Sequence, residues 1–161
     1  MAKRQQVCQL IEDYFKANDY SYSVNEEDTE SWNLVTGFQD SENQNEVIGV
    51  IISVYEDSLI VNSIASKKLN TEKFNDLAEF LMRVNGILKR GCFMINCDNR
   101  YEVSMRIWAT IKGRFTDNDI SYLLNVSLGS FSLVMPWLNK ISNGELPVLT
   151  SFEGYKQAVE P

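Results

Sequence analysis

The segment Val47–Ala65 constrains the fold more than any other part of the sequence. It reads VIGVIISVYEDSLIVNSIA, two runs rich in β-branched residues around a short polar turn. Such runs favour strands, and a turn this short joins strands that run antiparallel. The first run is expected to be mostly buried on both faces. Its drier face is predicted to carry Ile48, Val50, Ile52 and Val54.

Two more strands are predicted before this hairpin. Tyr20 to Asn25 alternates large and small polar side chains, which is typical of a short strand. The next strand places four side chains on one face: Trp32, Leu34, Thr36 and Phe38. Together with the hairpin they form a four-stranded antiparallel meander.

A second hairpin is predicted from the segment GCFMINCDNRYEVSMRI, residues 91–107. A two-residue loop would mix apolar and charged side chains on one face. A three-residue loop, Asp98–Arg100, instead places Phe93 opposite Met105 and Ile95 opposite Val103, which gives one continuous apolar face. The apolar pattern therefore favours the three-residue loop.

Two helices are predicted before this second hairpin. The first carries an apolar stripe at three- and four-residue spacing and ends near Asn18-Asp19. The second begins after Asn70, whose side chain is well suited to an N-cap, and is expected to continue until Gly91.

A third helix is predicted to start after Thr116 or Asp117 and to close at Asn143-Gly144. Pro136 lies inside it and predicts a kink or a break, because proline cannot donate the helical hydrogen bond. The remaining residues, 145–161, have weak periodicity and are expected to form a tail that packs loosely or becomes ordered in an assembly.

These elements follow the order α-β-β-β-β-α-β-β-α. The strands are not separated by regular helical crossovers, so the sheet is expected to be antiparallel, with helices covering one face. The predicted fold class is α+β. The predicted organisation is a single domain over residues 1–144 followed by a C-terminal tail over 145–161.

The composition argues against most enzymatic chemistry. The chain has 161 residues and no histidine, which removes the commonest general base and the usual zinc ligand sets. Neither a phosphate-binding loop nor a glycine-rich dinucleotide motif occurs. Paired carboxylates such as Glu12-Asp13 are adjacent and expected to face solvent. We therefore predict a protein that is not an enzyme and that has no catalytic residues, metal or cofactor.

The charge is negative overall and unevenly distributed. The net charge of −7 disfavours binding to nucleic acid or to an anionic membrane. Residues 12–66 contain twelve acids and one base, whereas residues 83–114 contain seven bases and two acids. This asymmetry is typical either of solvated loops or of a polarised surface that orients a partner.

The cysteines and the N-terminal segment indicate a cytoplasmic protein. Three cysteines, an odd number, fit a reducing compartment better than a disulfide framework, and no secretion signal or membrane span is recognisable. Cys92 and Cys97 are five residues apart on one strand, so they are expected to point to opposite faces and cannot hold one ion together. Cys97 is expected in the core and Cys92 partly exposed. A redox role for Cys92 stays open, because Lys89 and Arg90 lie nearby.

The three tryptophans receive different predictions. Trp32 and Trp137 are expected in the core or at its edge. Trp108 falls on the face opposite Val103, Met105 and Ile107, beside Arg106, and is expected to be exposed. An exposed aromatic beside an arginine is typical of a binding interface. The candidate partner- or dimer-binding residues are Trp108, Arg106 and Trp137.

Residues 81–107 and 119–141 resemble the YbjN-like family of bacterial sensory transduction regulators, which shares its fold with the type III secretion chaperones, and the resemblance covers most of residues 5–142. In that family a helix ending in an Asn leads through a Gly and a Phe into a strand, and the final helix contains a late proline. The matching positions are Asn85, Gly91, Phe93 and Pro136. The turn at residues 98–100 departs from the family, whose members often have a glycine there.

The resemblance implies an α+β domain without catalytic residues. It also implies small acidic homodimers that hold protein segments. We therefore predict a non-enzymatic, cytoplasmic protein-binding or chaperone-like regulator that binds a protein client and forms a homodimer. The alternative is a domain that binds a small ligand, with weak catalysis, in a cleft between helix and sheet.

Overall fold

The computed structural model describes residues 3–25, 30–39, 47–66, 68–96, 102–111 and 113–159. It contains six strands and four α-helices within these residues, and a short 3-10 helix. The helices are α1 (Lys3–Ala17), η1 (Thr71–Lys73), α2 (Phe74–Asn85), α3 (Asp117–Ser142) and α4 (Val148–Val159). The strands are β1 (Tyr22–Asn25), β2 (Trp32–Gln39), β3 (Val47–Val54), β4 (Ser58–Ala65), β5 (Cys92–Asn96) and β6 (Glu102–Thr110).

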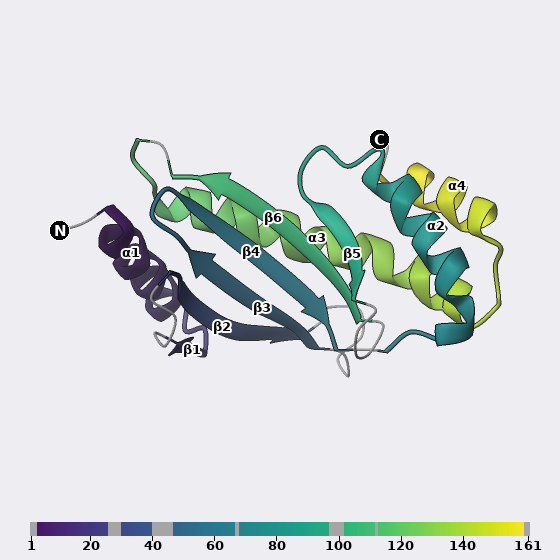
Figure 1. Ribbon diagram of the computed structural model, residues 1–161, viewed down its shortest axis with the longest axis horizontal. Coiled ribbons are helices and arrows are strands. Elements are labelled where there is room, and N and C mark those ends of the chain that lie inside the picture. Colours follow the sequence, from purple (N-terminus) through teal and green to yellow (C-terminus); the bar gives the residue numbers. More distant parts are fainter. Residues whose placement is uncertain are drawn as a thin grey trace.

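All six strands form one antiparallel sheet in the order β1-β2-β3-β4-β6-β5 (Figure 1). The first four strands make the predicted meander. The second hairpin joins it through β6, so β5 lies at the edge of the sheet. The predicted α+β class with an antiparallel sheet is confirmed.

The register of the second hairpin is the one expected from a continuous apolar face. Phe93 pairs with Met105 and Ile95 pairs with Val103. Both pairs place apolar side chains together on the side of the sheet that faces the helices. The loop itself, residues 97–101, lies outside the described residues, and so does Cys97.

The core lies between one face of the sheet and the helices. Along β3 and β4 alternate side chains are buried, as predicted for the drier face of β3. The opposite side chains of β3 are only partly buried, so the expectation that this strand is mostly buried on both faces is wrong. One buried polar pair joins the layers: the hydroxyls of Ser63 in β4 and Ser127 in α3 lie 2.6 Å apart. Both side chains are fully buried, and each hydroxyl satisfies the other, which avoids the cost of an unpaired polar group.

The second helix begins as predicted and ends earlier. The side chain of Asn70 accepts a hydrogen bond from the backbone N–H of Glu72, so Asn70 caps η1, which continues into α2. The helix ends at Asn85, with Gly86 as its C-cap, and not near Gly91. The segment that follows α2 must turn back to start β5, and Gly91 has a φ of 76°, which suits glycine.

α3 is one helix of 26 residues that continues through Pro136. The predicted break is therefore absent. Pro136 is exposed, on the side of the helix away from the buried residues Val134, Met135 and Leu138. By length and composition α3 could span a membrane, but nine of its side chains are buried in this fold, as expected of a core helix.

The C-terminal segment differs most from expectation. The expected loose tail is instead the helix α4, which packs against α2 and α3 (Figure 1). Tyr155 is only 2% exposed, and its ring meets that of Phe80 in α2 edge-on, with centroids 6.2 Å apart. Only Ser151 and Tyr155 of α4 are buried, and the surface that they contact is formed by α2 and α3.

Candidate protein-binding surface

One face of the sheet has no described helix over it. α1 and α3 pack on the buried face, and Figure 1 shows α3 behind the strands when the molecule is viewed from the other side. Side chains alternate across a sheet, so every buried strand residue has neighbours on this second face. We call this second face, formed by β2, β3, β4, β6 and β5, the open face.

Apolar side chains form much of the open face. The register places Ile60 of β4 directly opposite Trp108 of β6. Val35 lies opposite Ile51 on β2 and β3, and Val35 is exposed. Trp108 is 62% exposed. An uncovered tryptophan next to β-branched side chains is costly to leave in water and favourable to bury against a partner.

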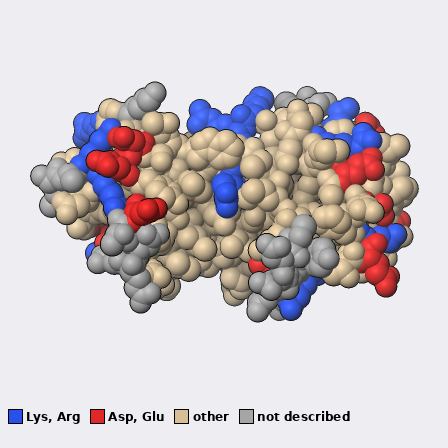
Figure 2. Space-filling view, viewed as in Figure 1, with Lys and Arg blue, Asp and Glu red and all other residues tan. Residues whose placement is uncertain are grey.

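Charge is sparse in the middle of this face and gathers at the two ends of the molecule and along its upper edge (Figure 2). Arg106 is exposed here, with Asn62 as its neighbour on β4 and Cys92 as its neighbour on β5. No carboxylate of the described residues forms an ion pair with Arg106. The side-chain oxygen Oδ1 of Asn62 is buried without a hydrogen bond. The middle of the open face therefore presents the exposed guanidinium of Arg106 without an ion-pair partner among the described residues, whereas the Asn62 oxygen is out of reach of a partner.

The predicted site residues do not all come together. Trp108 and Arg106 lie on the open face, as the alternation of β6 predicts. Trp137 lies on α3, where it is half-buried against Gly154 of α4 and its ring lies 4.6 Å from the ammonium group of Lys140. Trp137 thus packs between two helices of the same chain, away from the open face. Trp32 is in the core, as predicted.

The residues that carry the family resemblance hold the end of α2 to β5. The side chain of Asn85 donates to the carbonyl oxygen of Phe93 at 2.9 Å and accepts from its N–H at 2.7 Å. It therefore pairs with one β5 residue as a neighbouring strand would. A Cβ on Gly91 would lie 2.8 Å from the carbonyl oxygen of Arg106, so the chain passes close to β6 there. These positions have structural roles.

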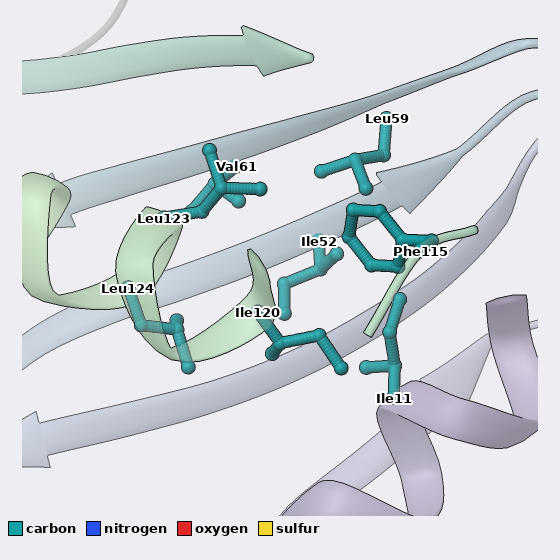
Figure 3. A pocket seen from close by; sticks show the side chains of 8 residues that line it. All are labelled: Ile11, Ile52, Leu59, Val61, Phe115, Ile120, Leu123 and Leu124. Atoms are coloured by element: carbon teal, nitrogen blue, oxygen red, sulfur yellow. The ribbon is translucent and has the colours of Figure 1, made fainter. Parts of the chain in front are cut away.

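The space between helices and sheet is small. A cavity lined by eight apolar side chains from α1, the sheet and the start of α3 lies at the predicted place for a ligand cleft (Figure 3). Its volume is about 10 Å³, which is room for at most one water molecule. Figure 3 shows Phe115 and Ile11 pointing into this space together with Ile52 and Ile120. A metabolite does not fit in this cavity.

Groups typical of catalysis or metal binding were also sought. No three His, Cys, Asp or Glu side chains of the described residues lie close enough together to hold a metal ion. Cys92 is a free thiol, half-buried at the sheet edge. Its redox role stays a hypothesis that nothing in the fold supports.

Sequence reasoning did not predict Arg90 and Arg114 as binding residues. Both line an open depression beside the end of β6, together with Trp108 and Tyr122. The excess of bases in residues 83–114 was the available signal, but only the fold shows which of them are neighbours.

Comparisons with known proteins support the fold. No family model matches the sequence, and no curated protein matches it. Among solved structures the chain is similar to YbjN from E. coli, described as "a putative transcription regulator", with a TM-score of 0.60 and 12% sequence identity. The match covers 85% of this chain and 93% of YbjN. It shows a shared fold and a distant structural relationship.

Proposed function

We propose that the protein is a non-enzymatic, cytoplasmic protein-binding or chaperone-like regulator that acts as a homodimer and belongs with the YbjN-like proteins. The observation that carries the proposal is the open face with Trp108 at 62% exposure and Arg106 beside it. Tryptophan and arginine are the residues most enriched at binding hot spots. A large exposed apolar area on a soluble domain is typical of a protein interface.

Two further observations favour binding over catalysis. The chain has no histidine, and the cavity between helices and sheet is too small for a metabolite. YbjN, with the same fold, is described as a regulator, which is compatible with this proposal. The small-ligand alternative would need a different site.

Trp108→Ala tests the proposal. Truncating a hot-spot tryptophan at an interface costs at least about 2 kcal/mol, so the dissociation constant of the homodimer should rise about thirtyfold. Sedimentation equilibrium measures this constant, and thermal unfolding checks that the variant is folded. Because Trp108 is exposed, its truncation should leave the melting temperature almost unchanged.

Met82→Ala is the matched control. Met82 is an apolar side chain on α2 with 70% exposure, and it lies away from the open face. Its removal should not affect dimerisation. The proposal fails if the parent protein is strictly monomeric and retains no polypeptide on purification, or if Met82→Ala weakens the dimer as much as Trp108→Ala does.

A further inference from the structure

β5 is shorter than β6, and this leaves part of β6 without a neighbour on one side. The register of β5 covers only residues 102–106 of β6. In the part of the chain that the structure describes, residues 107–110 pair with β4 alone. Alternate residues of an antiparallel ladder point their backbone groups to opposite sides, so about half of these groups face away from β4. We call residues 107–110 the free edge. Such an edge is a template for another strand.

The free edge forms one wall of an open depression of about 340 Å³. Trp108, Ala109 and Thr110 line it from β6, and Tyr122 lines it from α3. Gly91 lies close to Arg106 and Ile107 of β6 immediately before β5 begins, and the chain that leads up to it lies outside the sheet. A strand added along the free edge would therefore continue the line of β5. The free edge is long enough for about four residues of extended chain, roughly 13 Å.

Most of the charged side chains described around the free edge are basic. Arg90 and Arg114 line the depression and are exposed, and the guanidinium carbon of Arg90 lies 5.2 Å from the centre of the Tyr122 ring. Neither arginine forms an ion pair with a carboxylate of the described residues. Figure 2 shows Lys and Arg side chains gathered along the upper edge of the molecule, near the start of β5 in Figure 1.

One acid lines the depression, and it already has partners. The carboxylate of Asp119 accepts hydrogen bonds from the backbone N–H of Thr116 at 2.8 Å and from its hydroxyl at 2.7 Å. Asp119 therefore caps the start of α3, and no ion pair joins it to Arg90 or Arg114. Its negative charge offsets part of theirs, but the two arginines outnumber it among the described residues of the depression. A positive site remains on a chain whose net charge is −7.

The positive charge of Arg90 and Arg114 favours one kind of binding partner at the free edge over others. Two copies paired through their free edges would bring arginines against arginines, which disfavours a second copy. A nucleic acid would meet the negative charge of the whole chain and would leave the backbone groups of the strand unpaired. An extended polypeptide with acidic side chains satisfies both the backbone groups and the arginines.

We infer that the free edge of β6 binds an extended acidic segment of a protein partner, which adds to the sheet as a strand in line with β5. The inference deepens the proposed function, because it names the chemistry of the partner, and it rests on that function being protein binding. Trp108 lies where the free edge meets the open face, so one partner could contact both.

The test uses the full chain and a short blocked peptide that alternates glutamate with valine or threonine. Amide hydrogen exchange followed by NMR should show new protection at the amides of Trp108 and Thr110, which point away from β4, when the peptide is added. The same peptide with its backbone nitrogens methylated cannot complete the ladder, so its affinity should fall at least about fivefold. A peptide with lysine in place of glutamate should not bind.

Arg90→Ser and Arg114→Ser should each lower the affinity for the acidic peptide about threefold to tenfold, and added salt should weaken binding in the parent protein. Lys68→Ser is the matched control, since Lys68 is an exposed base outside the depression and its loss changes the net charge equally. The control should bind like the parent protein.

The inference is overturned if no new protection appears at Trp108 and Thr110 at millimolar peptide, or if the methylated peptide binds equally well. It is also overturned if Lys68→Ser weakens binding as much as the two arginine variants do. A dimer that depends on Trp108 without edge protection would leave the proposed function in place and remove this inference. Edge protection in a strictly monomeric protein would support the inference and remove the homodimer.

Discussion

Trp137 and Gly154 show how closely α3 and α4 approach each other. A Cβ on Gly154 would come within 2.6 Å of Cζ3 of the Trp137 ring, too close for any real side chain. The indole is a rigid plane, so it can only move as a whole. Glycine at this position lets α4 lie flat on Trp137 and bury Tyr155.

Gly154→Ala should therefore destabilise the protein. Overpacking costs about 1–3 kcal/mol, which outweighs the gain of up to about 1 kcal/mol that alanine brings to a helix. Gly129→Ala is the control, because Gly129 lies in α3 with nothing within 4 Å of an added Cβ. It should raise the free energy of unfolding by about 0.5–1 kcal/mol. Urea unfolding measures both. Equal effects of the two substitutions would contradict this view of the α3–α4 contact.

Tyr155 should make the fold sensitive to alkali. Burial raises the pKa of its phenol, because the phenolate would lose its hydration. The unfolded chain gives up this proton near pH 10, while the folded chain still holds it, so stability falls as pH rises above about 10.

Tyr155→Phe removes that proton, and the variant should lose less stability than the parent between about pH 10 and 11.5. Thermal unfolding at neutral and alkaline pH measures the difference. Tyr122→Phe is the comparison, since Tyr122 is exposed. If the Tyr155→Phe variant loses stability along the same curve as the parent, the burial of Tyr155 does not control the alkaline transition.

At the scale of elements, α2 and β5 are joined by one side chain. Asn85 is the last residue of α2 and makes two hydrogen bonds to the backbone of Phe93. The ring of Phe93 packs edge-on against the ring of Phe131 in α3, with the ring centroids 5.4 Å apart. β5 pairs with only one strand, so this asparagine acts as its second neighbour at one residue. This contact also positions the segment between α2 and β5, which carries Arg90.

Asn85→Ala should lower the free energy of unfolding by about 1–3 kcal/mol, because it leaves a donor and an acceptor of Phe93 unpaired. Asn118→Ala, at an exposed position in the first turn of α3, should change it by less than about 0.5 kcal/mol. Chemical denaturation measures both values. Amide exchange at Phe93 should accelerate in the Asn85 variant alone, and unchanged exchange would show that β5 does not depend on this contact.

At the scale of the whole molecule, local sequence patterns predicted which side chains lie on each face of the sheet. They did not predict how α4 packs or where α2 ends. Alternation along β3 and β6 indicated which side chains are buried, since this pattern depends only on neighbours in the sequence. The position of Trp108 on the open face followed from the same alternation, whereas its contact role stays a prediction.

The remainder depends on residues far apart in the chain. α4 buries only Ser151 and Tyr155 and packs on surfaces that α2 and α3 supply. The early end of α2 had a visible signal in Asn85-Gly86, but Gly91 gave an equally plausible stop. The free edge depends on which residues of β6 lie opposite β5 and on which arginines lie beside them. Sequence patterns therefore predicted the fold class and part of the candidate site, and missed its basic edge.

The pairing of β4 with β6 also has a kinetic consequence. The meander and the second hairpin can each form from contacts close in sequence, but the ladder between them joins residues 58–64 to residues 104–110 across η1, α2 and β5. Closing such a long connection costs conformational entropy before any contact compensates for it. Docking of the hairpin onto the meander is therefore expected to limit the rate of folding. The contact between Val61 of β4 and Ile107 of β6 should already be formed in the transition state.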